Sequence, residues 1–489
     1  MLLQSSIDYI VIVFYLMLVL FVGSFAGGKQ NSAKDYFLGS SKISWWAVCF
    51  SIVAAETSSL TFISIPGLAY LTNLSFLQVT FGYLLGRIII AKFLLPAYFK
   101  GELSTAYAYL ENRFGVKTRR FASIIFLFTR VAADGVRLFA TAIPLKLMLN
   151  LSYPQAIMII AVVAFIYTYF GGLKGIIWVD VMQMFIYLFG AILALIFISN
   201  SLPSGLISIF NFAAENDKLK IFDLGFDLGF KEFITKPYSL FAGMLGGAFL
   251  SMASHGTDQL IVQRLLSTKD LSSARKAVIG SGIIVIIQFA IFLFVGLGLF
   301  AFYNGVSVES LNLIKADEIF PKFILEKIPN GLSGLIVAGL FAAALSTLAG
   351  SISALSSSAM LDLYKPLKRN INTASELKIS RFFSVLWTVL LILSALFFMS
   401  SPTIVVELAL SIASFTYGGL LGTFLLGIFI KKSQQEDALA AFMAGILVMI
   451  SFVSMKIVGW TWFTFVGVSV TIMVGALLNK LDFVNSRNK

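Results

Sequence analysis

Cysteine, histidine and charged residues are all scarce in this chain of 489 residues. It contains one cysteine, Cys49, and one histidine, His255. A lone cysteine excludes a disulfide within the chain and a cysteine-based metal cluster, and a lone histidine leaves little for metal or acid–base chemistry. The sequence also lacks a phosphate-binding loop, a haem-ligand pair and a channel selectivity-filter run. These absences argue against an enzyme and against an ion channel, and they predict that the protein has no organic cofactor.

Charge is sparse because apolar residues dominate. Only 12% of the residues are charged and 58% are hydrophobic, and the mean hydropathy of +0.92 lies far outside the range of water-soluble domains. Apolar runs of roughly 20 residues, the length that a helix needs to cross the hydrocarbon core, recur along the chain. The short alternating segments of a β-barrel are not seen. The sequence therefore predicts an all-α integral membrane protein surrounded by a lipid bilayer.

About 13 membrane-spanning segments are predicted. No linker or soluble domain interrupts them, so residues 1–489 are predicted to form a single membrane domain. The predicted spans cover residues 7–27, 45–70, 76–99, 119–148, 154–170, 175–199, 237–264, 273–303, 332–361, 377–400, 402–430, 437–457 and 459–480.

Basic residues are distributed unequally between alternate loops. About 23 Lys and Arg fall in one set of loops and about eight in the other. Because basic residues stay cytoplasmic, the C-terminus is predicted to lie inside and the N-terminus outside a multi-pass protein of the cell (inner) membrane. The net charge of +12 therefore reports orientation and does not indicate a nucleic-acid partner.

Two predicted spans carry polar residues where the hydrocarbon core should be. In the second span, residues 56–59 (Glu-Thr-Ser-Ser) are polar in succession, and Pro66 and Gly67 follow; in the seventh, residues 255–259 (His-Gly-Thr-Asp-Gln) lie in mid-membrane. In lipid every backbone group needs a partner, so broken helices occur where they are packed inside protein or line a polar cavity. Both spans are predicted to be kinked or unwound at these residues.

Four other spans separate the two interruptions. Unwound helices at the same place in two halves are the pattern of secondary transporters built from inverted repeats. The halves would be residues 45–199 and 237–430, with five spans each. A leading helix at 7–27 and two trailing helices within 437–480 complete the predicted transport domain.

The ninth span, AGLFAAALSTLAGSISALSSSAM (residues 338–360), combines small residues with adjacent hydroxyls. Small residues allow helices to approach closely, and this role alone accounts for Ala and Gly. Ser346 and Thr347, facing an unwound helix with free carbonyls, would complete a weakly charged cage of oxygen atoms. Such a cage suits a monovalent hard cation that must bind and then leave.

Five motifs carry a resemblance that covers nearly the whole chain. They are AAETSSLTFISIPGLAY, STAYAYLENRF, YFGGLKGIIWVDVMQ, TDQLIVQRLLSTK and AGLFAAALSTLAGSISALSS. In these motifs the chain resembles the sodium:solute symporter family, which includes sodium/glucose, proline, pantothenate, iodide and bacterial sialic acid transporters. The resemblance implies a five-plus-five inverted-repeat (LeuT-like) core with an extra leading helix, and at least one bound sodium ion.

The resemblance also assigns the sodium ligands. Some relatives bind a second sodium with an Asp, which is Asp180 here, and two hydroxyls, which are replaced here by Ala349 and Gly350. This departure predicts one sodium per cycle. The first sodium is expected between the first and eighth core helices, held by backbone carbonyls and side-chain hydroxyls of Ala54, Thr57, Ala343, Ser346 and Thr347.

For the solute, the resemblance points to the two interrupted spans and their neighbours. The carboxylate-binding Arg of the sialic acid transporters has no clean match, because the alignment falls on Ala133 or Asp134, with Arg130 and Arg137 a turn away. The TDQLIVQR motif looks most like the sugar transporters. The expected solute-binding residues are Glu56, Ser58, Thr61, Thr80, His255, Asp258 and Gln259.

Other charged residues in the spans have structural alternatives. Glu56 either lines the solute site or pairs with Arg130 or Arg137, since ionisable groups inside membranes are rare and usually functional. Asp134 and Arg137 are spaced to pair on one helix face. Asp180 either lines an ion exit path or braces a helix.

Two further basic residues, Arg87 and Lys92, are expected to extend toward the cytoplasmic surface. The YLENRF segment is expected to be an amphipathic helix on that surface.

Sodium-coupled uptake of a small polar organic solute by alternating access is the predicted function. A sugar, polyol or sugar acid such as sialic acid is the first choice of solute, and an amino acid or monocarboxylate the second. The principal alternative is a proton-coupled carrier of the same fold that protonates Glu56 or Asp180. The expected partners are the solute, sodium and lipid, with a monomer as the functional unit.

Overall fold

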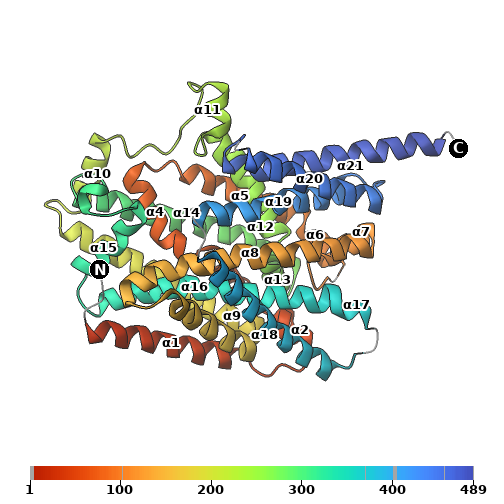
Figure 1. Cartoon of the computed structure of the whole chain (residues 1–489), viewed down its shortest axis with the longest axis horizontal. Helices are drawn as coiled ribbons and strands as arrows, with labels where there is room; N and C mark the ends of the chain where they lie inside the picture. Colours follow the sequence, from red (N-terminus) through yellow and green to blue (C-terminus); the bar gives the residue numbers. More distant parts are fainter. Residues whose placement is uncertain (1–4, 102, 369–370, 400–404, 456, 488–489) are drawn as a thin grey trace.

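A computed structural model describes residues 5–101, 103–368, 371–399, 405–455 and 457–487 of the chain. Within these residues, helices and short helical turns make up the regular structure, apart from one isolated bridge between Ile43 and Thr268. The helices lie side by side in one bundle, and the two ends of the chain lie at opposite ends of it (Figure 1). The prediction of an all-helical protein is confirmed.

The helices that build the bundle are long and mostly apolar. They are α1 (Ser6–Ala26), α3 (Trp45–Glu56), α4 (Ser59–Leu71), α5 (Leu77–Phe93), α8 (Val116–Leu149), α9 (Tyr153–Asn200), α12 (Gly247–Gly256), α13 (Gln259–Leu266), α14 (Leu271–Phe302), α16 (Leu332–Ser358), α18 (Thr373–Phe398), α19 (Val405–Phe429), α20 (Gln435–Ser454) and α21 (Phe463–Arg487).

Shorter helical elements connect or extend these helices. They are α2 (Ala33–Leu38), η1 (Gly39–Ser41), α6 (Leu95–Lys100), α7 (Ala108–Phe114), α10 (Leu206–Glu215), α11 (Phe230–Thr235), η2 (Ala242–Gly246), η3 (Glu309–Leu311), η4 (Ala316–Glu318), α15 (Ile319–Lys327), η5 (Ala359–Tyr364), α17 (Lys365–Leu367) and η6 (Trp460–Trp462).

By length and composition, eight helical segments among the described residues can cross a membrane, or nine when the bent pair α3–α4 is counted as one span. The predicted count of 13 is therefore not confirmed. The predicted spans 154–170 and 175–199 correspond to the two helices of the 48-residue element α9, which meet at a kink at Gly172. The start of the predicted span 402–430, at residues 402–404, lies outside the described residues.

Both predicted interruptions are present. α3 ends at Glu56 and α4 begins at Ser59, with Thr57 and Ser58 extended between them (φ −80°, ψ 107° and φ −91°, ψ 166°). The two segments are bent by 63°. In the seventh predicted span, α12 ends at Gly256 and α13 begins at Gln259. The polar residues at both places therefore end one helix and begin another, as their sequence predicted.

A glycine bends α9 near its middle. Gly172 has φ 56° and ψ −161°, a backbone conformation that residues with a Cβ atom rarely adopt. A Cβ atom at this position would lie 2.7 Å from the Tyr36 carbonyl oxygen of α2. The turn predicted between spans at 171–174 is thus present as a kink at Gly172, where the two helices of α9 meet.

α16, the ninth predicted span, lies at the centre of the bundle. In its most apolar stretch 94% of the residues are buried, against 22% for α1. Its N-terminus is closed by the leading helix, because the Asp8 carboxylate accepts hydrogen bonds from the amides of Gly331 (2.6 Å) and Gly334 (2.8 Å) and from the Ser333 hydroxyl (2.8 Å). A carboxylate is favoured at a helix N-terminus, where amides lack intrahelical partners. The leading helix therefore fixes one end of the central helix.

The YLENRF segment forms α7, which confirms that it is a short helix. Leu110 and Phe114 are buried. The Arg113 guanidinium donates to the carbonyl oxygens of Gly427 (3.0 Å) and Ile430 (2.7 Å) at the end of α19. The long segments 200–236 and 304–331 contain α10, α11 and α15, and α11 projects from the side of the bundle (Figure 1).

Lys218, in the segment after α10, closes the C-terminal end of α4. Its Nζ donates to the carbonyl oxygens of Tyr70 (2.7 Å) and Thr72 (2.8 Å) and lies 4.1 Å from the centroid of the Phe300 ring. A cation at a helix C-terminus satisfies carbonyls that have no intrahelical partner. Burial lowers the pKa of Lys218 to about 8.

Lys218→Met is expected to destabilise the protein by about 1–3 kcal/mol, because carbonyls at the end of α4 lose their buried donor. The pKa of Lys218 is lowered from 10.5 to about 8, so the unfolded chain binds more protons between these values. The contribution of this group to stability therefore rises as pH rises through that window. Thermal unfolding at several pH values measures both effects.

Lys220→Met is the matched control, since Lys220 is exposed and pairs with Asp223 at 3.5 Å. Its loss is expected to cost less than about 1 kcal/mol. Equal losses for the two variants would contradict a capping role for Lys218.

Candidate functional site

The break between α3 and α4 faces α16 across a small cavity whose lining mixes polar and apolar residues. The cavity is about 20 Å³, room for roughly one water-sized body, and its wall includes Ser58 and Ser59 from the break and Ala343 and Thr347 from α16. The remaining lining residues come from α8 and α16 and are Asp134, Arg137, Leu138, Thr141, Ala344 and Leu348. The structure therefore brings two of the predicted sodium ligands next to the unwound segment.

The other predicted sodium ligands are buried but are not among the residues that line this cavity. Ala54 and Ser346 are 0% exposed and Thr57 is 1% exposed. The Thr57 hydroxyl donates to the Val53 carbonyl oxygen (2.9 Å) and accepts from the Gln288 amide (2.5 Å). Among the residues that the structure describes, no group of three His, Cys, Asp or Glu side chains is placed to hold a metal. The Thr57 hydroxyl therefore lies among neutral polar groups.

Asp180 connects the central helix to the second broken helix. Its carboxylate accepts from the hydroxyls of Ser51 (2.5 Å) and Ser346 (2.6 Å) and pairs with the Arg264 guanidinium (3.0 Å). Gly350 lies against the same guanidinium, because a Cβ atom there would be 2.7 Å from an Arg264 nitrogen. These contacts join α3, α9, α13 and α16. They match the alternative in which Asp180 holds helices together and does not line an ion exit path.

Glu56, the carboxylate at the first break, pairs with Arg87 of α5. Arg87 is 0% exposed and also donates to the Ser281 hydroxyl (2.8 Å). His255 Nε2 lies 3.5 Å from the same carboxylate. The expectation that Arg87 reaches the cytoplasmic surface is therefore wrong, and Glu56 does not pair with Arg130 or Arg137. A buried guanidinium needs a carboxylate partner, and Glu56 supplies it.

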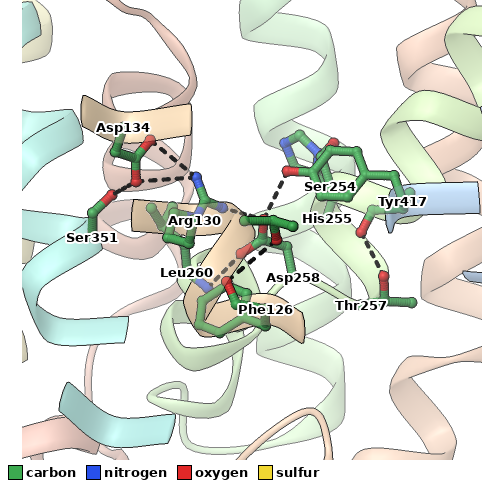
Figure 2. Close-up of polar contacts among 12 residues, drawn as sticks. Phe126, Arg130, Asp134, Ser254, His255, Thr257, Asp258, Leu260, Ser351 and Tyr417 are labelled. Carbon is green, nitrogen blue, oxygen red and sulfur yellow. Dashed lines mark hydrogen bonds and ion pairs between the residues drawn. The ribbon is translucent and has the colours of Figure 1, made fainter. Parts of the chain in front are cut away.

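A second charge cluster surrounds the other break. Figure 2 shows Arg130 of α8 between the carboxylates of Asp134 and Asp258, which follows the end of α12. The Arg130–Asp134 distance is 3.4 Å. Asp258 also accepts from the Tyr417 hydroxyl (2.7 Å) and from the Leu260 amide at the start of α13 (2.9 Å). The side chain that begins α13 is thus anchored to α8 and α19.

The same cluster reaches the small cavity through Asp134. This carboxylate accepts from the Ser351 hydroxyl of α16 and pairs with Arg137 at 3.1 Å. The predicted pairing of Asp134 and Arg137 is confirmed. Arg137 is 29% exposed and lines a second cavity of about 20 Å³ as well, beside Arg130 and Tyr417. It is therefore the guanidinium that borders both cavities.

Five of the predicted solute residues line neither cavity: Glu56 and His255, described above, and Thr61, Thr80 and Gln259. Thr80 is fully buried in α5, where its hydroxyl donates to the Leu77 carbonyl oxygen (2.8 Å). Gln259 accepts from the Ala106 amide (2.8 Å) and donates to the Ser357 hydroxyl (3.1 Å). Thr61 sits in the first turn of α4, where its amide is 3.4 Å from the Ser58 hydroxyl. Thr80, Gln259 and Thr61 are not among the residues that line either cavity.

The sequence interpretation missed several partners of these groups. Arg87 was expected at the surface, and Arg264, Ser51, Tyr417 and Gln288 were not singled out. A signal for the arginines was present, because an arginine inside a long apolar span needs a carboxylate or a path to the surface. Which carboxylate such an arginine contacts depends on how helices distant in the sequence pack together. That packing could not be predicted from the sequence alone.

A membrane-spanning helical bundle with two broken helices meeting at a buried polar site is the architecture of a secondary transporter. Residues 36–445 match the model of the sodium:solute symporter family. The chain therefore belongs to the sodium:solute symporter family, as the sequence motifs indicated. Sodium-coupled symport of a small organic solute by alternating access follows from this membership.

Individual relatives agree over most of the chain. It is 28% identical to a sodium/sialic acid symporter, NanT, of Aliivibrio fischeri over 99% of this chain and 95% of that protein. It is 28% identical to the human sodium-coupled monocarboxylate transporter 1 over 90% of this chain and 72% of that protein. A solved structure of a Na⁺-coupled sialic acid symporter, described as substrate-bound and outward-open, superposes with a TM-score of 0.88 at 26% identity, covering 98% of each chain.

Proposed function

We propose that the solute is a small polar organic acid, with a sugar acid such as sialic acid as the first choice and a monocarboxylate as the second. The main support for this proposal is the position of Arg137, whose guanidinium is 29% exposed and lines both cavities beside the broken helices. A guanidinium binds a carboxylate through two parallel hydrogen bonds. The hydroxyls of Ser58 and Ser59 on the same wall offer partners for a hydroxylated solute.

The relatives support an acidic solute. The protein from Aliivibrio fischeri is named for sialic acid and the human protein for monocarboxylates, and both solutes carry a carboxylate. A neutral sugar or polyol is the alternative, in which Arg137 remains paired with Asp134 and the solute uses the hydroxyls. In that case Glu56, His255 and Asp258 influence solute binding indirectly. They do so through the ion pairs that Arg87 and Arg130 form at the two breaks. Thr61, Thr80 and Gln259 remain proposed solute residues that would need the site to open.

The proposed ion site holds one sodium per cycle. The carbonyls of Ala54, Thr57 and Ala343 and the hydroxyls of Ser346 and Thr347 are its proposed ligands. Support comes from Ala343 and Thr347, which line the small cavity, and from the burial of Ala54, Thr57 and Ser346. Asp180 is already neutralised by Arg264 at 3.0 Å, so a second sodium would have to displace a paired guanidinium, which favours one ion.

The proposed architecture keeps thirteen spans, with five-plus-five inverted repeats at 45–199 and 237–430, a leading helix and two trailing helices. It also keeps the N-terminus outside, the C-terminus cytoplasmic, and a monomer in the inner membrane. The two breaks, at residues 57–58 and 257–258, support the repeats because they interrupt the first helix of each proposed half.

Coupling to sodium rather than to protons is tested first with proteoliposomes. Uptake of labelled sialic acid is expected to need an inward sodium gradient and to persist when an uncoupler collapses the proton gradient. Uptake that is indifferent to sodium and abolished by the uncoupler would instead support a proton-coupled carrier acting through Glu56 or Asp180.

The charge of the solute decides the response to membrane potential. One sodium with a monoanionic acid carries no net charge, so a potential clamped with potassium and valinomycin is expected to leave uptake unchanged. A tenfold sodium gradient then supports about tenfold accumulation. One sodium with a neutral sugar adds about 2.3 kcal/mol per 100 mV, which raises the limit to roughly 500-fold. Uptake that rises steeply with an inside-negative potential would contradict the acidic solute.

Arg137→Gln is expected to weaken binding of the acid by roughly 10- to 150-fold, because hydrogen bonds to charged groups contribute about 1.5–3 kcal/mol each. Lys146→Gln, on the same helix but away from both cavities, is the matched control. Titration by thermal shift in saturating sodium measures both. Equal affinity in wild type and Arg137→Gln would remove the guanidinium from the solute site.

A further inference from the structure

An apolar groove on the side of the bundle is far larger than either cavity at the site. Its volume is about 510 Å³, within the roughly 300–1,000 Å³ typical of pockets for small molecules. α5 and α12 form one wall, and α19 and α21 form the other. The one polar side chain of its lining, Ser469, already donates its hydroxyl to the Phe465 carbonyl oxygen (2.9 Å). A ligand that fills this groove must therefore be hydrocarbon along most of its length.

The groove has a buried floor and an exposed rim. Met252, Leu425 and Val468 are 4%, 5% and 2% exposed, whereas Phe93 and Phe429 are 39% and 62% exposed. The floor is thus sealed against the interior of the protein, and the rim opens to the surroundings. Around a membrane-spanning bundle those surroundings are lipid chains.

One end of the groove is basic. Lys92 Nζ lies 5.3 Å from the centroid of the Phe93 ring on the rim, and Lys431 follows the rim residue Phe429 by two positions. Arg275 is held beside this end by a hydrogen bond to the backbone of α5 (2.8 Å). Within the described part of the chain, neither Lys92 nor Lys431 forms an ion pair. Unpaired basic side chains at the end of an apolar groove match an anionic headgroup above a fatty chain.

We propose that this groove binds one acyl chain of an anionic glycerophospholipid. The headgroup phosphate lies against Lys92 and Lys431, in the leaflet at the basic end, which is the predicted cytoplasmic side. The acyl chain lies between the Phe93 and Phe429 rings, which are 6.1 Å apart at their centroids, and extends over the floor toward Val468.

The site has a consequence for transport that rests on the proposed function. The wall helix α12 ends at the second break, and α5 carries Arg87, the partner of Glu56. The opposite wall helix α19 carries Tyr417, which holds Asp258. A chain lodged between these walls sets their spacing, so the lipid regulates how readily the two sides of the site separate.

Long-chain phosphatidylglycerol is the probe, added to the full-length protein purified in a neutral detergent. Native mass spectrometry is expected to retain one phosphatidylglycerol per protein, and thermal unfolding is expected to shift upward with its concentration. Phosphatidylcholine of the same chain length is expected to bind more weakly. The double variant Lys92→Gln with Lys431→Gln is expected to weaken phosphatidylglycerol binding roughly 30-fold. The two lysines are expected to contribute about equally to this factor, as basic residues near an anionic lipid surface do.

Ser469→Phe fills the groove and is expected to abolish the retained lipid. Its matched control is Ser451→Phe on α20, because Ser451 is exposed and makes the same kind of hydrogen bond, to the Leu447 carbonyl oxygen (3.1 Å). Lys378→Gln, exposed on α18, controls for loss of charge. These measurements use neither sodium nor solute, so their failure is distinct from failure of the proposed transport function.

Three outcomes would overturn the proposal. In the first, the lysine and Ser469→Phe variants bind phosphatidylglycerol as tightly as wild type. In the second, glycerol phosphate or a short-chain phosphatidylglycerol produces the same thermal shift, so that the headgroup alone is recognised. In the third, Ser469→Phe changes the oligomeric mass, so that a second copy of the chain occupies the groove.

Discussion

Arg130→Met is expected to lower the stability of the protein by about 3–5 kcal/mol, the usual result of removing one partner from a buried ion pair. Arg130 is 7% exposed and contacts both Asp134 and Asp258. Methionine fills a similar volume but leaves the buried Asp258 carboxylate without its cation, while Asp134 keeps only its pair with Arg137. Because Asp258 begins α13, the second break is expected to loosen at the same time.

The matched control is Arg137→Met, about two turns further along the same helix. Arg137 also contacts Asp134, but through one pair at 3.1 Å with 29% of its side chain exposed. Its removal is expected to cost less than about 1 kcal/mol while impairing solute binding. Thermal unfolding of both variants in detergent gives the comparison. Equal destabilisation by the two variants would contradict the assignment of Arg130 to structure and Arg137 to binding.

Thr347→Val is expected to abolish sodium stimulation of uptake at ordinary sodium concentrations. Valine keeps the shape of the side chain but removes a hydroxyl ligand, and contacts with a charged partner contribute about 1.5–3 kcal/mol, or roughly 10- to 150-fold in sodium affinity. The Thr347 hydroxyl donates to the Ala343 carbonyl oxygen (3.1 Å), so its lone pairs remain available for the ion. Uptake measured against sodium concentration reports the shift.

Two controls separate ion binding from folding. Thr347→Ser keeps the hydroxyl and is expected to retain sodium stimulation. Thr388→Val removes a buried hydroxyl with the same kind of contact, to the Ser384 carbonyl oxygen (2.7 Å), on α18 away from the breaks. It is expected to leave the sodium dependence unchanged. A Thr347→Val protein that keeps its full sodium dependence would show that the ion site lies elsewhere.

The two breaks were readable from the sequence because their cause is local. Polar residues at 56–59 and 255–259 stand in long apolar runs, and a proline and a glycine follow the first set. These residues weaken the helix where they occur, so the interruption appears at the position that the sequence indicates. The contact between Asp134 and Arg137 was predictable for the same reason, since it depends on helical spacing alone.

The partners across helices were not readable. Glu56 was expected either to line the solute site or to pair with Arg130 or Arg137, yet it pairs with Arg87, 31 positions along the chain. Arg130 instead meets Asp258, 128 positions away. These pairings depend on which helices pack together and at what depth. A count of spans based on hydropathy misses some helices for a related reason. The helix α8 carries several charged residues, which lower its hydropathy although the interior of the bundle can accommodate them.

The hydrogen bonds from Asp8 to the start of α16 also constrain the order of events during synthesis. The carboxylate and the Gly331 amide are separated by 323 positions, and ribosomes add roughly 5–20 residues per second. The first helix therefore enters the membrane about 15–65 s before its partner exists. Until then its buried acid has no protein donor, so the central helix of the ion site reaches its final position only after two-thirds of the chain has been made.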